Sequence, residues 1–459
     1  MVKKCLPLAI NHKLGIKLKG KTDVLQQQHM PTKTAKINRK SPPVIKDAVD
    51  LHLELKPYEK YTLRNGVDVY AIDAGAEEVL QVEWVYYAGN WYEEQNLIAA
   101  STNFLLRNGT STKTAFQINE HFEYYGSYLN RACYNETATV TLHSLTRHIA
   151  ELLPVVKEIL TDSVFPQTEL DIYKQNMKQR LNVNLKKADF IASRLIDAYL
   201  YGEQHPYGRF SSFEAFDAVE QQSVKDFYKQ YYLSGKLVMF VAGKLPANIF
   251  QLLDENFGDL AHQPLKVEPA AVTPATQKKY RITNDPNGMQ GSIRMAIPFP
   301  NRHHPDFLKA QVLNIVLGGF FGSRLMSNIR EEKGYTYGIH SYLQNHIQQS
   351  GWLITTEAGR DVCEATIAEV YKEMELLRNE PVGEEELSLV RNFMIGSILG
   401  DLDGPFHIIN RWKNIILNGV PEDYFNRQME TIKTVSAEEL QGLANKYLQP
   451  ENFYELVVV

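Results

Sequence analysis

Apolar residues in the first half of the chain switch between the two-residue period of a strand and the 3.6-residue period of a helix. Residues 61–70 predict two short strands joined by a tight turn at Asn65-Gly66, a dipeptide typical of hairpins. Residues 79–87 predict the next strand, and residues 97–107 predict a helix with one apolar face. Further helices are expected at 117–125, 145–160, 169–185, 189–200 and 224–231, and further strands at 128–133, 137–142 and 237–242.

The second half of the chain repeats this order of elements at low identity, which indicates an internal duplication. A strand at 292–298 and a helix at 307–317 parallel the pair at 79–87 and 97–107. The parallel continues through a strand at 352–356, a helix at 362–377, a long helix that starts at Glu384 and a last strand at 454–459. The pattern therefore predicts an α+β protein built from two tandem homologous units.

The chain should divide into four parts. Residues 51–261 and 279–459 are the expected N-terminal and C-terminal domains, because 459 residues are too many for one ordinary core. Residues 262–278, with three prolines among small and polar residues, are expected to link them. Residues 1–50 are expected to form a flexible basic segment.

The first forty residues are the one compositional anomaly. They hold ten Lys or Arg residues against the single acid Asp23, and the apolar run 5–10 is too short for a secretory signal. A flexible tail fits this composition better than a targeting peptide, and Met30 is an alternative start. No apolar run reaches the length of a transmembrane helix, so a soluble protein without a membrane partner is expected.

Global composition describes an ordinary globular protein. Apolar residues make up 44% and charged residues 22%, and the net charge of -5 favours neither nucleic acid nor an anionic membrane as a partner. The three cysteines are odd in number and widely spaced, which suits a reducing compartment. A cytoplasmic location is therefore expected, ahead of a periplasmic one.

A glycine-rich stretch at 318–338 organises the second half. The helix at 307–317 stops at a glycine pair, and a second short helix carries Arg324 and Arg330. Gly334 then precedes an aromatic segment that should begin a strand and contains Tyr337. The guanidinium of Arg330 and the hydroxyl of Tyr337 could hold an extended peptide or stabilise an oxyanion. Alternatively, Arg330 pairs with a neighbouring glutamate and Tyr337 fills a strand face.

This stretch resembles a known family. The strings Ser323-Arg324-Leu325 and Ile329-Arg330-Glu331, followed by Gly334 and Tyr337, resemble the C-terminal half of the insulinase/pitrilysin metallopeptidases. The resemblance extends over about residues 58–459. It implies two α/β-roll domains, each an antiparallel sheet packed with helices, that form half of a clamshell. It also implies that Arg330 and Tyr337 hold substrate near a zinc ion.

The family's zinc motif, His-x-x-Glu-His, has no counterpart here. Aligning on Gly109-Thr110 places Ala100 and Phe104 at the histidines and Asn103 at the glutamate. A methyl group and a phenyl ring offer no lone pair to zinc, and a carboxamide is no general base near neutral pH. The remaining glutamate ligand is matched by Gln179 or Arg180, and an arginine would repel a cation. No metal and no cofactor are therefore expected in this chain.

These residues favour a non-catalytic, substrate-binding subunit of a heteromeric zinc metallopeptidase that cleaves peptides or unfolded segments. A homologous partner subunit would carry the zinc, while this chain supplies Arg330, Tyr337 and an edge strand at 128–133. One alternative is a catalytically silent scaffold or peptide-binding protein of the same fold. A weaker alternative is a zinc endopeptidase in its own right. When isolated, the chain could also pair with itself as a homodimer.

Overall fold

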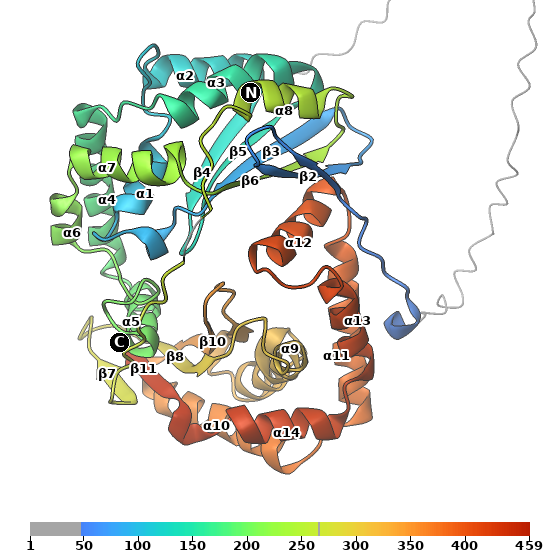
Figure 1. Ribbon diagram of the computed structural model, residues 1–459. Helices are drawn as coiled ribbons and strands as arrows, with labels where there is room; N and C mark the ends of the chain where they lie inside the picture. The colour runs from blue at the N-terminus through green and yellow to red at the C-terminus, as the bar shows by residue number, and fades with distance from the viewer. Residues whose placement is uncertain (1–46, 265–266) are drawn as a thin grey trace, which may run out of the picture. The chain divides into compact units, whose positions relative to one another are not determined.

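The structure is a computed structural model, and it describes residues 47–264 and 267–459. The predictions for the basic segment up to Lys46, including the alternative start at Met30, lie outside the described residues. The described residues form helices and two mixed β-sheets, which confirms the α+β class (Figure 1).

The first sheet has six strands in the order β1-β2-β6-β3-β5-β4. Its strands are β1 (Glu59–Thr62), β2 (Asp68–Asp73), β3 (Val79–Tyr86), β4 (Tyr128–Cys133), β5 (Ala138–Leu145) and β6 (Leu237–Gly243). The hairpin predicted at Asn65-Gly66 is confirmed: β1 pairs antiparallel with β2, and Gly66 adopts the positive φ of 89° that this turn requires. Strand β4 lies at the edge of the sheet, as predicted for 128–133.

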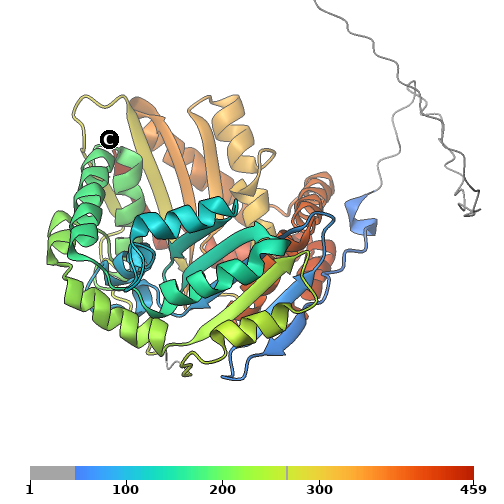
Figure 2. The same cartoon turned by 90° about the horizontal axis from the view of Figure 1, so that it is seen from above.

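Helices pack over and beside this sheet, and those drawn above its strands in Figure 1 lie in front of them in the view of Figure 2. They are α1 (Ile98–Leu105), α2 (Ala115–Tyr124), α3 (Ile149–Thr161), α4 (Gln167–Asn184), α6 (Phe213–Ala218), α7 (Gln221–Tyr228) and α8 (Ile249–Phe257). Fully buried Trp84 packs against Phe257 of α8, with ring centroids 5.1 Å apart. The helix predicted at 145–160 starts later, because Leu145 still pairs with Val79 in the sheet.

The second sheet has five strands in the order β7-β11-β8-β10-β9. They are β7 (Lys279–Ile282), β8 (Gln290–Phe299), β9 (Thr336–Leu343), β10 (Ser350–Gly359) and β11 (Tyr454–Val458). Strand by strand this order repeats β2-β6-β3-β5-β4, including one parallel pair, β11 with β7 and β2 with β6. The duplication is thus visible in the topology, and β9 corresponds to β4. The sheets are mixed rather than antiparallel, because the last strand of each unit returns beside the first after a long helical connection.

The helices of the second half cover the second sheet and connect the halves. They are α9 (Phe307–Asn314), α10 (Cys363–Asn379), α11 (Glu384–Gly400), α12 (Pro405–Leu417), α13 (Tyr424–Thr434) and α14 (Ala437–Tyr447). Helix α9 continues into a π-helical turn, Ile315–Gly319, before the glycine-rich stretch. A second π-helical segment, Met326–Glu332, carries Arg330.

One helix of each half packs on the sheet of the other half. Helix α5 (Ala188–Tyr201) contacts β8 and β11 of the second sheet, and α12 contacts β2 and β6 of the first. Asp189 of α5 pairs with Arg294 of β8, while Lys413 of α12 pairs with Glu83 of β3 at 2.8 Å. Within the predicted linker, the backbone N–H of Ala275 donates to the carbonyl of Tyr199 at 2.9 Å. The two halves interlock, and the domain boundaries drawn from the sequence stay a prediction.

Among the described residues, no helix has both the length and the apolar character that crossing a bilayer requires.

Candidate functional site

Helix α1 contains the three residues that the sequence aligns with the zinc motif, and Glu93 fixes the start of this helix. The Glu93 carboxylate accepts hydrogen bonds from the backbone N–H of Leu97 at 3.2 Å and of Ala99 at 2.9 Å. The side chain is only 5% exposed. Burial raises the pKa of Glu93 to about 6, although the backbone N–H groups oppose this rise. Glu93 therefore serves as a cap for the start of α1.

Asn103, predicted at the position of the general base, is a buried structural amide. Its Nδ2 donates to the carbonyl oxygen of Thr139 on β5 and to the hydroxyl oxygen of Tyr232, both at 3.2 Å. A glutamate carboxylate has no N–H to donate, so its oxygens would be repelled by the Thr139 carbonyl. The surroundings of Asn103 thus fit an amide and oppose a carboxylate.

Ala100 and Phe104 are the residues predicted at the two histidine positions. Phe104 is 38% exposed, and its ring centroid lies 4.7 Å from that of Tyr173 on α4. Arg180, predicted opposite this site, is exposed on α4 seven residues beyond Tyr173, which is about 10 Å along a helix axis. The sequence analysis missed Tyr173, although its burial beside Leu170 follows the apolar stripe of α4. The assignment of Arg180 as the degenerate ligand position stays a prediction.

A different arginine brings positive charge to this site. The guanidinium carbon of Arg131, on edge strand β4, lies 4.9 Å from the centroid of the Phe104 ring. Its Nη1 donates to the Phe104 carbonyl oxygen and, at 3.4 Å, to Oδ1 of Asn108. Burial, and next the charge of Arg107, lower the pKa of Arg131 to about 9. Within the described part of the chain, neither arginine forms a salt bridge.

The described residues offer no alternative metal centre. Nowhere among residues 47–264 and 267–459 do three or more His, Cys, Asp or Glu side chains converge as metal ligands. A zinc site normally needs three or four such ligands. That this chain holds no zinc nevertheless stays a prediction.

Arg330 and Tyr337 lie on either side of one turn at Gly334, which has a φ of 66°. The guanidinium carbon of Arg330 lies 4.7 Å from the ring centroid of Phe321, itself 58% exposed. The pairing of Arg330 with Glu331 or a neighbour is not seen among the described residues. Tyr337 is 91% exposed at the start of edge strand β9, so it does not fill a buried strand face. Both side chains are therefore available to another molecule.

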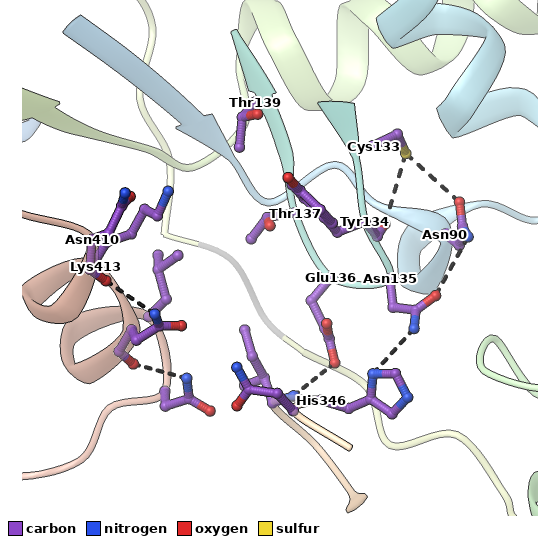
Figure 3. A pocket seen from close by; sticks show the side chains of 15 residues that line it. Asn90, Cys133, Tyr134, Asn135, Glu136, Thr137, Thr139, His346, Asn410 and Lys413 are labelled. Atoms are coloured by element: carbon purple, nitrogen blue, oxygen red, sulfur yellow. Dashed lines mark hydrogen bonds between the residues drawn. The ribbon is translucent and has the colours of Figure 1, made fainter. Parts of the chain in front are cut away.

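A cavity of about 620 Å³ lies between the two halves (Figure 3). Cys133, Asn135 and Glu136 border it from the first half, His346 from the β9–β10 loop and Lys413 from α12. Asn135 and His346 are hydrogen-bonded at 3.2 Å, and burial lowers the pKa of His346 to about 4.

Buried Glu136 joins the two halves at this cavity. Its carboxylate accepts hydrogen bonds from the hydroxyl of Tyr207 and from the backbone N–H of Ile347, the latter at 2.9 Å. Desolvation raises the pKa of Glu136. The sequence analysis missed this contact, because Glu136 is separated from Tyr207 by 71 residues and from Ile347 by 211.

Comparison with known proteins gives one family. Residues 218–394 match the family described as "Peptidase M16 inactive domain". The chain is 23% identical over 393 residues to "Uncharacterized zinc protease YmxG" of Bacillus subtilis, covering 84% of this chain and 95% of that protein. It is 22% identical to "Non-peptidase homolog YmxG" of Helicobacter pylori, covering 80% of this chain and 86% of the relative.

A solved structure shares the fold. The crystal structure of a peptidase M16 inactive domain from Pseudomonas fluorescens superposes with a TM-score of 0.79 at 22% sequence identity. The match covers 87% of this chain and 98% of that one. The tandem arrangement of two α+β units is therefore a fold that this family uses.

Proposed function

Because the chain is an inactive-peptidase-like homologue of the insulinase/pitrilysin (M16) family, we propose that it is the non-catalytic, substrate-binding subunit of a heteromeric zinc metallopeptidase. A homologous partner subunit carries the zinc and the general base. This chain supplies Arg330 and Tyr337 and helps to hold peptides or unfolded segments for cleavage. A cytoplasmic location is part of the proposal.

The availability of Arg330 and Tyr337 carries the proposal. Tyr337 is 91% exposed, and burying a tyrosine against a partner or substrate would be more favourable than leaving it in water. Although Glu331 and Glu332 follow Arg330 in the sequence, the Arg330 guanidinium stacks on the Phe321 ring in the structure. A guanidinium held in this way keeps its donors for a carbonyl or carboxylate of a substrate.

Edge strand β4 supports the second part of the proposal. It pairs with β5 on one side, and no strand of the described chain pairs with its other side. An extended peptide can add to such an edge through backbone hydrogen bonds that do not depend on sequence. This mode suits a subunit that presents varied peptides.

Reconstitution with a zinc-bearing homologue tests the proposal. The pair should cleave an unstructured peptide that neither this chain alone nor a zinc-depleted pair cleaves. Arg330→Ala should lower kcat/KM of the pair about 100-fold, the effect of removing one donor to a developing oxyanion, and Tyr337→Phe should also lower it. Matched controls are exposed residues away from β9, Arg427→Ala and Tyr124→Phe, which should leave the rate unchanged.

A scaffold or peptide-binding role is the second candidate, and one relative is indeed described as a non-peptidase homolog. It predicts that the pair stays fully active when Arg330 and Tyr337 are both replaced. The weaker candidate, a zinc endopeptidase acting alone, predicts proteolysis by the purified chain that a chelator abolishes. Either result would contradict the proposed division of labour.

A further inference from the structure

The guanidinium of Arg131 has unused hydrogen-bond donors. Both of its hydrogen bonds within the described chain come from Nη1, to the carbonyl of Phe104 and to Asn108. The N–H groups on Nε and Nη2 form no hydrogen bond with the described residues. Neither nitrogen is fully buried, so solvent reaches them. Nε and Nη2 together form the planar fork that binds a carboxylate through two parallel hydrogen bonds.

The surroundings of Arg131 are positive and aromatic. Arg107 is close enough to lower the pKa of Arg131, and its own Nη1 donates to the carbonyl of Leu129 at 2.9 Å. Tyr128 is 59% exposed and adds a hydroxyl at the same edge. Its electrostatic interaction opposes the lowering of the pKa of both arginines. Two carboxylates lie near this group, and neither forms a salt bridge with Arg107 or Arg131 among the described residues. Glu123 interacts electrostatically with Arg107, and Glu169 accepts a hydrogen bond from Asn108 at 2.8 Å. The two guanidinium groups therefore have no direct counter-ion within the described chain.

The ring of Phe104 holds this charge in place. Phe104 stands where the family has its second histidine, and Arg131 stacks on its face at 4.9 Å. The Phe104 ring also contacts Tyr173, with ring centroids 4.7 Å apart. A fixed organic cation thus lies beside the lost zinc position, on the strand to which a peptide would add.

We propose that Arg131, with Arg107 and Tyr128 beside it, forms an anion site that binds a carboxylate of an extended peptide lying along β4. The carboxylate comes either from the peptide C-terminus or from an acidic side chain, since both offer the same two oxygens. The inference rests on the proposed function only in that it places a peptide at β4. It gives this subunit a substrate preference of its own.

The test measures peptide binding to the full-length chain by fluorescence anisotropy at low ionic strength. Four versions of one labelled, extended octapeptide are compared: free C-terminus, C-terminal amide, amide with an internal Glu, and amide with an internal Gln. The wild-type chain should bind a carboxylate-bearing version about tenfold more tightly than its neutral counterpart, as expected for one charge-assisted bidentate pair. Which of the two carboxylates is preferred identifies its source.

Arg131→Gln should remove this discrimination and leave binding of the neutral peptides unchanged. The matched control is Arg194→Gln, because Arg194 also stacks on a phenylalanine, Phe210 at 4.0 Å, and donates to a backbone carbonyl at 2.6 Å. The control should keep the full tenfold preference. Arg131→Lys, which keeps the charge without the fork, should retain about a third of the preference and guards against a folding defect in Arg131→Gln.

Equal binding of charged and neutral peptides by the wild-type chain, or no binding of any, would overturn the inference. So would a preference that survives Arg131→Gln, or a loss of neutral-peptide binding in Arg131→Lys. These measurements involve neither a partner chain nor cleavage. If a reconstituted pair depends on Arg330 while the chain alone shows no carboxylate preference, this inference is wrong and the proposed function still holds.

Discussion

Asn103 donates a hydrogen bond from Nδ2 to the hydroxyl oxygen of Tyr232 at 3.2 Å. The same amide reaches the carbonyl of Thr139. Asn103 therefore ties helix α1 to strand β5 and to the π-helical turn Lys229–Leu233. Its side chain has a structural role, whereas its alignment with the glutamate of the family motif stays a prediction.

Asn103→Ala should destabilise the fold by about 1–3 kcal/mol, because it leaves the buried Thr139 carbonyl without this donor. Urea unfolding followed by circular dichroism measures the change. Asn414→Ala is the control: Asn414 also donates to a backbone carbonyl, at 3.0 Å, but it is exposed. Its cost should stay below about 0.5 kcal/mol, and equal costs for the two variants would show that Asn103 has no special role.

Much of the fold follows from local sequence patterns. The turn at Asn65-Gly66, the strand that contains Trp84 and the helix around Asn103 are set by turn chemistry and apolar periodicity within a few residues. The parallel strand pairs and the exchange of α5 and α12 between the halves are not. The strand pairs join residues such as Val69 and Met239, and α5 contacts β8 through Asp189 and Arg294, which are 105 residues apart. Periodicity does not encode contacts over such separations.

The candidate site shows the same limit. The assignment of Ala100, Asn103 and Phe104 to the motif comes from the alignment on Gly109-Thr110 and stays a prediction. Arg131 and Tyr173 could not, because a lone arginine on a strand and a tyrosine on a helix become informative only when both are seen against Phe104. The sequence placed the opposing positive charge at Arg180, whereas the guanidinium beside Phe104 belongs to Arg131.

Restoring the motif alone should not restore a zinc site. In the triple variant Ala100→His, Asn103→Glu, Phe104→His, the guanidinium of Arg131 would lie next to the new ligands and repel a divalent cation. Zinc content measured by atomic emission after dialysis should stay far below one ion per chain. Adding Arg131→Ala should raise it. Stoichiometric zinc in the triple variant would show that Arg131 does not prevent zinc binding.

The ion pair between Lys413 and Glu83 should be a strong link between the halves. Glu83 is 5% exposed, and Lys413 approaches both of its carboxylate oxygens, at 3.0 and 2.8 Å. Lys413→Ala should cost about 3–5 kcal/mol in urea unfolding, because it leaves a buried carboxylate unpaired.

Removing both charges should recover most of that loss, so Lys413→Met combined with Glu83→Gln is the informative second variant. Lys446→Ala is the matched control, since Lys446 is 55% exposed and its partner Asp306 keeps a hydrogen bond from the Tyr447 hydroxyl at 2.8 Å. Its cost should stay below about 1 kcal/mol. Similar losses for Lys413→Ala and Lys446→Ala would mean that the contact between the halves adds little.

Glu93 should make the fold less stable as pH rises from about 4.5 to about 6. Burial raises the pKa of Glu93 from an ordinary 4.5 to about 6 in the folded chain, so the folded state binds this proton more tightly than the unfolded state does. The stabilisation is therefore complete below the unfolded pKa and is lost as pH passes the folded one. The linked change is about 2 kcal/mol.

Glu93→Gln removes this titration. Relative to wild type, the variant should gain about 2 kcal/mol of stability between pH 4.5 and pH 7, whatever its cost at pH 4.5 from the lost acceptor for Leu97 or Ala99. Urea unfolding at half-unit pH steps measures the difference, with Glu430→Gln on the exposed side of α13 as the control. A constant difference between wild type and Glu93→Gln across this range would show that Glu93 ionises in the folded chain as it does in the unfolded one. Its carboxylate would then be a helix cap that the buried start of α1 accommodates without penalty.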